Sequence, residues 1–80
     1  MHELGIAMEI AEVSVARAGT ATPTRIVIAV GKLTAVLPDA LRFAWQATTE
    51  DSELAGCALE ILEVAGHELK IQQLEVNDGG

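Results

Sequence analysis

A run rich in β-branched residues, from Arg25 to Lys32, constrains the fold more than any other feature of the chain. Its composition predicts a strand. Both alternating sets of side chains are small or apolar; one set is Ile26, Ile28 and Val30, and the other is Val27, Ala29 and Gly31. A strand with two apolar faces lies in the middle of a sheet or has an oligomer contact behind it. We therefore expect this segment to be central to the fold.

An amphipathic helix is predicted from Glu3 to about Ala18. Apolar residues recur there at spacings of three and four, as Leu4, Ile6, Ala7, Ile10, Ala11 and Val13. Arg17 in the last turn complements the helix dipole, and Gly19 is placed to end the helix. The short stretch from Thr20 to Thr24, with its proline, is expected to be a connector.

A second helix is predicted to run to about Thr49. Pro38 and Asp39 suit the first turn of a helix. An apolar stripe follows at helical spacing, made of Leu37, Leu41, Ala44, Trp45 and Thr48.

Two further strands are predicted, from Cys57 to Val64 and from Glu68 to Val76, because both segments alternate. The short connection Ala65–His67 contains the glycine that a tight turn needs, so an antiparallel hairpin is the simple interpretation. Residues 77–80 are small and polar, and we expect a mobile tail there.

The predicted order is helix, strand, helix, strand, strand. With 80 residues there is room for one domain, residues 1–76, followed by the tail. The expected fold class is α+β with two layers, in which two helices pack on one face of a three-stranded sheet.

The charge balance excludes several classes of partner. Twelve acidic residues against five basic ones give a net charge of −7, which repels nucleic acids and anionic membranes. The acidic residues Glu3, Glu9 and Glu12 stand where a signal peptide would be basic or apolar. With a single cysteine no intrachain disulfide can form, so a cytoplasmic location is expected.

No catalytic set is recognisable, and we expect the protein not to be an enzyme. The chain has no glycine-rich phosphate loop and no second cysteine to pair with Cys57. Cys57 could meet His2 or His67 in space, but a thiol at the start of a strand is most often a core residue.

The first three residues, Met1, His2 and Glu3, form the candidate metal site. The terminal amine and the His2 amide nitrogen would close a five-membered ring around a metal, and the same amide with Nδ1 of His2 a six-membered one. Nitrogen donors in a plane suit Ni(II) or Cu(II). From the residues alone the alternative stays open that His2 is only a solvated terminal side chain.

Several segments together resemble one known family. The opening Met1–Ala7, MHELGIA, is similar to the MHELSIA opening of the HypA/HybF hydrogenase nickel incorporation proteins. Further similar segments follow in family order, and these are Ile28–Leu33, Val36–Ala44, Cys57–Ile61, Gly66–Ile71 and Leu74–Val76.

The resemblance implies nickel binding through Met1, His2 and Glu3 in the maturation of [NiFe] hydrogenase. It implies a HypB-like GTPase or the hydrogenase large subunit as partner. In the family two CxxC pairs bind zinc in a lobe between the last two strands, whereas here Val64 passes through Ala65 directly into Gly66. The zinc lobe is therefore absent at this point, and no structural zinc is expected.

Two functions are consistent with these observations. The first is a non-enzymatic nickel carrier, or metallochaperone, whose acidic surface docks a partner. The second is a metal-independent interaction or assembly module derived from the same scaffold, which the high apolar content favours. A homodimer is the expected oligomeric state.

Overall fold

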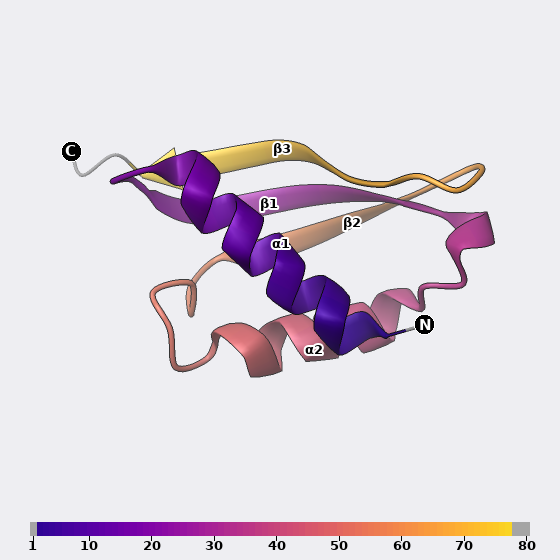
Figure 1. Ribbon diagram of the computed structural model, residues 1–80, viewed down its shortest axis with the longest axis horizontal. Coiled ribbons are helices and arrows are strands. Elements are labelled where there is room, and N and C mark those ends of the chain that lie inside the picture. Colours follow the sequence, from indigo (N-terminus) through magenta and orange to yellow (C-terminus); the bar gives the residue numbers. More distant parts are fainter. Residues whose placement is uncertain (1, 78–80) are drawn as a thin grey trace.

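The computed structural model describes residues 2–77. Two helices lie against one face of a three-stranded sheet, which confirms the predicted α+β fold (Figure 1). The elements in chain order are α1 (Glu3–Ala18), β1 (Thr22–Gly31), a 3-10 helix (Lys32–Thr34), α2 (Pro38–Thr49), β2 (Ala58–Val64) and β3 (Leu69–Asn77). Of the tail predicted at residues 77–80, Asn77 ends β3 and the rest lies outside the described residues.

Both helices have the predicted bounds. On α1 the buried residues are Ala7, Ile10 and Ser14, and Gly19 ends the helix with a φ of 63°, a conformation that glycine adopts without steric cost. On α2 the buried residues include Leu41 and Trp45, and Pro38 begins the helix.

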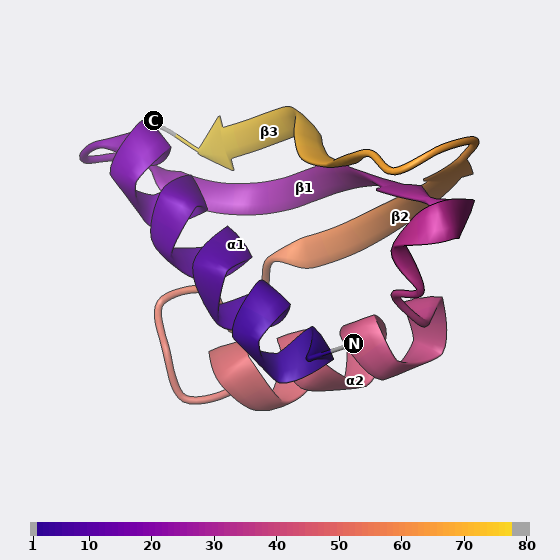
Figure 2. The ribbon, with the colours of Figure 1, turned by 45° about the vertical axis from the view of Figure 1, so that its right-hand side comes forward.

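Strand β1 is the middle strand of the sheet, in the order β2-β1-β3 (Figure 2). It begins at Thr22, inside the predicted connector. Ile26 and Ile28 face the helices and are buried, and Val27 and Ala29 on the opposite face are only 4% and 0% exposed. Their burial follows from the central position, because the side chains of both neighbouring strands flank them. Of the two predicted placements, the middle of a sheet is confirmed.

The predicted hairpin is wrong. Strand β2 pairs with β1 in parallel, and β3 pairs with β1 in antiparallel orientation, so β1 separates the two. A hairpin of β2 and β3 would leave at least one edge of β1 without hydrogen bonds, whereas the observed order satisfies the backbone of β1 on both sides. Alternation identified both strands but carried no information about their partner.

The chain crosses from β2 to β3 over the end of β1. In this crossing, Ala65–Glu68, the N–H of Gly31 donates to the carbonyl of Glu68 at 2.6 Å. The N–H of Leu33 donates to the carbonyl of Gly66 at 2.9 Å. A Cβ at Gly31 would lie 2.2 Å from the carbonyl oxygen of Gly66, so only glycine fits beneath the crossing.

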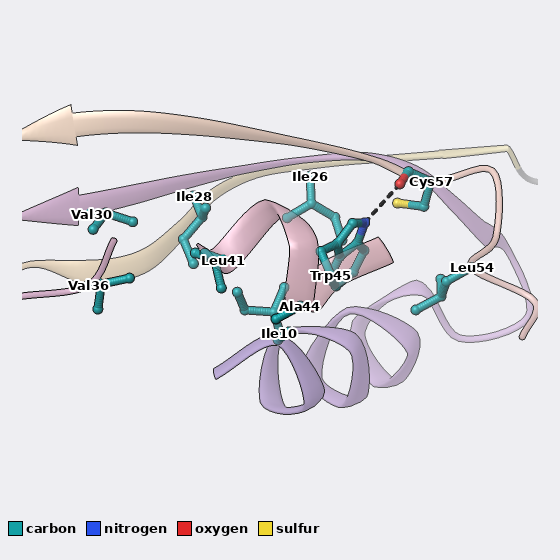
Figure 3. Close-up of a cluster of buried hydrophobic side chains, with 11 residues drawn as sticks. Ile10, Ile26, Ile28, Val30, Val36, Leu41, Ala44, Trp45, Leu54 and Cys57 are labelled. Atoms are coloured by element: carbon teal, nitrogen blue, oxygen red, sulfur yellow. Dashed lines mark hydrogen bonds between the residues drawn. The ribbon is translucent and has the colours of Figure 1, made fainter. Parts of the chain in front are cut away.

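The core lies between the sheet and the helices (Figure 3). Its largest ring, Trp45, is 5% exposed, and its Nε1 donates to the carbonyl of Cys57 at 3.0 Å. This bond satisfies the buried indole N–H and joins α2 to the residue that precedes β2. The other labelled members are Ile10, Ile26, Ile28, Val30, Val36, Leu41, Ala44 and Leu54.

We predict that Gly31→Ala lowers the free energy of unfolding by about 1–3 kcal/mol, because the new methyl group forces the crossing away from β1. Gly56→Ala is the matched control, since a Cβ there meets nothing within 4 Å. Urea denaturation of both variants measures the effect. Equal unfolding midpoints for the two variants would contradict the assigned role of Gly31.

Candidate metal site

His2 lies at the start of α1 and is exposed to solvent. Its carbonyl accepts the first hydrogen bond of the helix, from the N–H of Ile6 at 3.1 Å. Helix formation therefore fixes the backbone from His2 onward and leaves the imidazole accessible. The preceding candidate ligand, Met1, lies outside the described residues.

Glu3 links the starts of the two helices. Its Oε2 accepts a hydrogen bond from the backbone N–H of Leu37 at 3.0 Å. Leu37 is the N-cap residue of α2 and has no side-chain oxygen to cap that helix. The carboxylate of Glu3 therefore serves as a cap supplied from α1, and it also interacts favourably with the positive end of the α2 dipole.

The same contact lowers the pKa of the Glu3 carboxyl below its ordinary value of 4.5. The largest cause is the hydrogen bond from Leu37, followed by a hydrogen bond from the backbone N–H of Glu3 itself. Both bonds favour the charged carboxylate. This structural role was not predicted from the sequence, in which the available signal is an α2 start without a capping side chain.

Side chains alone do not form a metal centre in the part of the chain that the structure describes. Within residues 2–77 no group of three or more His, Cys, Asp or Glu side chains could hold an ion. The structure does bring His2 and Glu3 together at one helix start, but it directs the Glu3 carboxylate to Leu37. A site here would depend on nitrogen donors of the terminal backbone together with the His2 imidazole.

The remaining thiol and imidazole lie elsewhere. Cys57 is buried, and burial raises the pKa of its thiol, which disfavours a reactive thiolate. The prediction that Cys57 is a core residue is confirmed. His67 lies exposed in the crossing between β2 and β3.

An ion-pair network occupies the face of the sheet away from the helices. Arg25 of β1 donates from Nη2 to Glu60 of β2 at 2.9 Å, and from Nη1 to Glu75 of β3. Hydrogen bonds to Glu60 and then Glu75 raise the pKa of the guanidinium. Glu60 and Glu75 lie on the two strands that were predicted to form a hairpin. Their contact with Arg25 requires the observed strand order, in which β1 lies between them.

Neither helix within residues 2–77 combines the length and the apolar composition that a membrane span requires.

Comparison with known proteins identifies a family: residues 1–69 match the family described as "Hydrogenase/urease nickel incorporation, metallochaperone, hypA". The chain belongs to the HypA family.

Similar proteins named "Hydrogenase maturation factor HypA" include one from Crocosphaera subtropica, 36% identical over 91% of this chain. Those from Nostoc punctiforme and Desulfosudis oleivorans are 41% and 46% identical over 82% and 80% of it. The HypA-like chain spans 71%, 58% and 59% of the length of these three relatives. The short crossing Ala65–Glu68 is compatible with the absence of the family's zinc lobe.

We predict that Glu3→Gln removes a pH-dependent part of the stability. Because the folded pKa of Glu3 lies below 4.5, its contribution is complete above that pH and is lost as the pH falls through the folded value. The difference in free energy of unfolding between wild type and Glu3→Gln should therefore be constant near neutral pH and shrink below pH 4.5.

Denaturation at a series of pH values measures this difference. Glu9→Gln, an exposed position on the same helix, is the control for loss of a charge. A wild-type advantage over Glu3→Gln that persists unchanged at the lowest pH would contradict the assigned contact.

Proposed function

We propose that this chain carries Ni(II) for the maturation of [NiFe] hydrogenase, without catalysing a reaction. The terminal amine of Met1, the amide and imidazole nitrogens of His2 and the backbone of Glu3 would bind the metal as cargo. The observation that carries the proposal is an exposed His2 at a helix start that Glu3 ties to α2. Such an anchored helix start lowers the entropy lost when the chelate closes.

The donor set suits nickel. Amine, amide and imidazole nitrogens arranged in adjacent rings favour a planar geometry, which Ni(II) accepts and Mg(II) or Ca(II) does not. Binding requires the amine and the imidazole to lose their protons, so acid should release the metal. No structural zinc is part of this proposal.

Charge also has to be favourable, because the positive end of the α1 dipole opposes a cation at this position. The carboxylate of Glu3 lies in the same turn, and the chain has a net charge of −7. Both attract a divalent cation to this end of the molecule.

The relatives' name, hydrogenase maturation factor, supports a role in maturation. We propose that this role is exercised in the cytoplasm. A HypB-like GTPase or the hydrogenase large subunit is the partner that this role requires. Exposed apolar side chains lie near the proposed site: Leu4 follows Glu3 and is 56% exposed, and Leu37, which Glu3 contacts, is 63% exposed. A partner that covers them would also cover the metal.

The same exposed side chains favour a second candidate, a metal-independent interaction module. Phe43 on α2 is 75% exposed, which is unusual for the only phenylalanine of a small domain. The two candidates differ in one observable. A module of this kind would bind its partner equally well after nickel is stripped, whereas a carrier would bind differently with and without its cargo.

Calorimetric nickel titration of the protein with its native Met1 terminus tests the carrier function. We expect one specific site, which is lost on N-terminal acetylation and in His2→Ala, because each change removes a nitrogen donor. His67→Ala is the matched control, since it removes the only other histidine and should leave nickel binding unchanged.

Circular dichroism would verify that every variant keeps the fold. Nickel binding of wild-type affinity in the acetylated protein and in His2→Ala would refute the terminal chelate. Complete absence of a site in the unmodified protein would favour the interaction module.

A further inference from the structure

Strand β3 forms one edge of the sheet. It pairs with β1 along one side, and no strand among residues 2–77 pairs with its other side. Such an edge presents backbone N–H and C=O groups that another strand can pair with. Its side chains determine which strand fits.

The sequence of β3 is complementary to itself when reversed. The centre of this symmetry lies between Gln72 and Gln73. In an antiparallel pair of two β3 strands, the opposed residues would be Leu69 with Val76, Lys70 with Glu75, Ile71 with Leu74, and Gln72 with Gln73. Each apolar residue thus meets an apolar residue, and each charge meets its opposite. Opposed pairs of these kinds stabilise antiparallel sheets.

A β-bulge makes this register geometrically consistent. Val27 of β1 pairs with Gln73 and Ile28 pairs with Ile71, so Gln72 is one residue extra. As a result Ile71 and Leu74 both pack against the core on the helix side, although they are three positions apart. Residues directly opposed across two strands point to the same face. Without the bulge, Ile71 and Leu74 would face opposite sides and could not oppose one another.

The charges and the surface beside the edge also suit a second copy. Lys70 has no ion-pair partner within residues 2–77. The hydrogen bonds that Arg25 and Gln73 donate to the Glu75 carboxylate both end on Oε2. An open groove runs between α1 and β3, and its apolar lining is Ile6, Ile10, Val13, Ile28, Leu69 and Ile71. The apolar side chains of a second β3, Leu74 and Val76, would lie beside this groove.

The other edge strand lacks these properties. Strand β2 contains Glu60 and Glu63 but no basic residue. It has no bulge, so opposed residues in a symmetric pair must be an even number of positions apart. Every such register then opposes each acid to an apolar residue or to itself. The complementarity is therefore specific to β3.

We propose that two copies of this chain associate through their β3 edges, antiparallel and about a twofold axis perpendicular to the sheet. The two sheets become one continuous sheet, with both helix layers on the same side. Lys70 of each copy pairs with Glu75 of the other, and this symmetric contact goes beyond the proposed carriage of nickel.

Sedimentation over a dilution series tests the contact by charge exchange. Lys70→Glu alone and Glu75→Lys alone each oppose like charges at two symmetric positions, so each should raise the dimer dissociation constant at least about tenfold. An equimolar mixture of the two variants should form a heterodimer. In it the lysine introduced in one copy faces the glutamate introduced in the other, and the native Glu75 and Lys70 also face each other. Lys32→Glu is the control, since it makes the same charge change at the only other lysine.

Circular dichroism reports whether each variant is folded. If Glu75→Lys unfolds through loss of its contact with Arg25, the comparison of Lys70→Glu with Lys32→Glu decides the question alone. A monomeric wild type at every concentration would overturn the proposal, as would equal dimerisation of Lys70→Glu and Lys32→Glu. Two folded charge variants that do not associate when mixed would overturn it as well.

Discussion

The burial of β1 on both faces and along both edges determines the rest of the structure. Its helix-facing side chains, among them Ile26 and Ile28, form the floor of the core. On its opposite face, Val27 and Ala29 are buried. Arg25 on that face forms ion pairs with both neighbouring strands. Because β2 and β3 occupy opposite edges of β1, the chain has to cross between them.

The crossing at Gly31 and the contact at Glu3 each meet a backbone requirement of this small fold. At the first, backbone passes so close to backbone that no side chain fits. At the second, a helix without its own cap obtains one from the preceding helix, and the start of α1 is held beside α2 as a result. The start of α1 lies beside α2 in both views of the ribbon, consistent with this contact (Figures 1 and 2). The contact at Glu3 thus positions two of the residues proposed to bind nickel, His2 and Glu3.

The helices could be predicted from the sequence because their signals are local. The spacing of apolar residues such as Ala7 and Ile10 on α1, and Leu41 on α2, marks the buried face of each helix. Gly19 marks the end of α1, and Pro38 marks the start of α2. The three strands could also be predicted because alternation and β-branched composition are local signals. Strand pairing could not be predicted, because alternation in β2 and β3 is satisfied equally by a hairpin and by two separate contacts with β1.

The residues of the candidate site could be predicted from the sequence, but the contacts that hold them in place could not. His2 and Glu3 stand out through donor chemistry and family resemblance. The hydrogen bond from Leu37 to Glu3 joins positions far apart in the sequence, so it follows only from how α1 packs against α2. The ion pairs of Arg25 depend in the same way on the strand order.

X-ray absorption at the nickel edge of the metal-loaded protein tests the central claim, a terminal chelate of nitrogen donors, most directly. If the terminal chelate holds nickel, the spectrum should show a planar set of light donors, mainly nitrogen, with a histidine imidazole signature and no sulfur. A first shell that contains sulfur, or one of six oxygen donors, would contradict it. A sulfur donor would place nickel on the thiol of Cys57 or on a methionine. Six oxygen donors would place it on surface carboxylates or water.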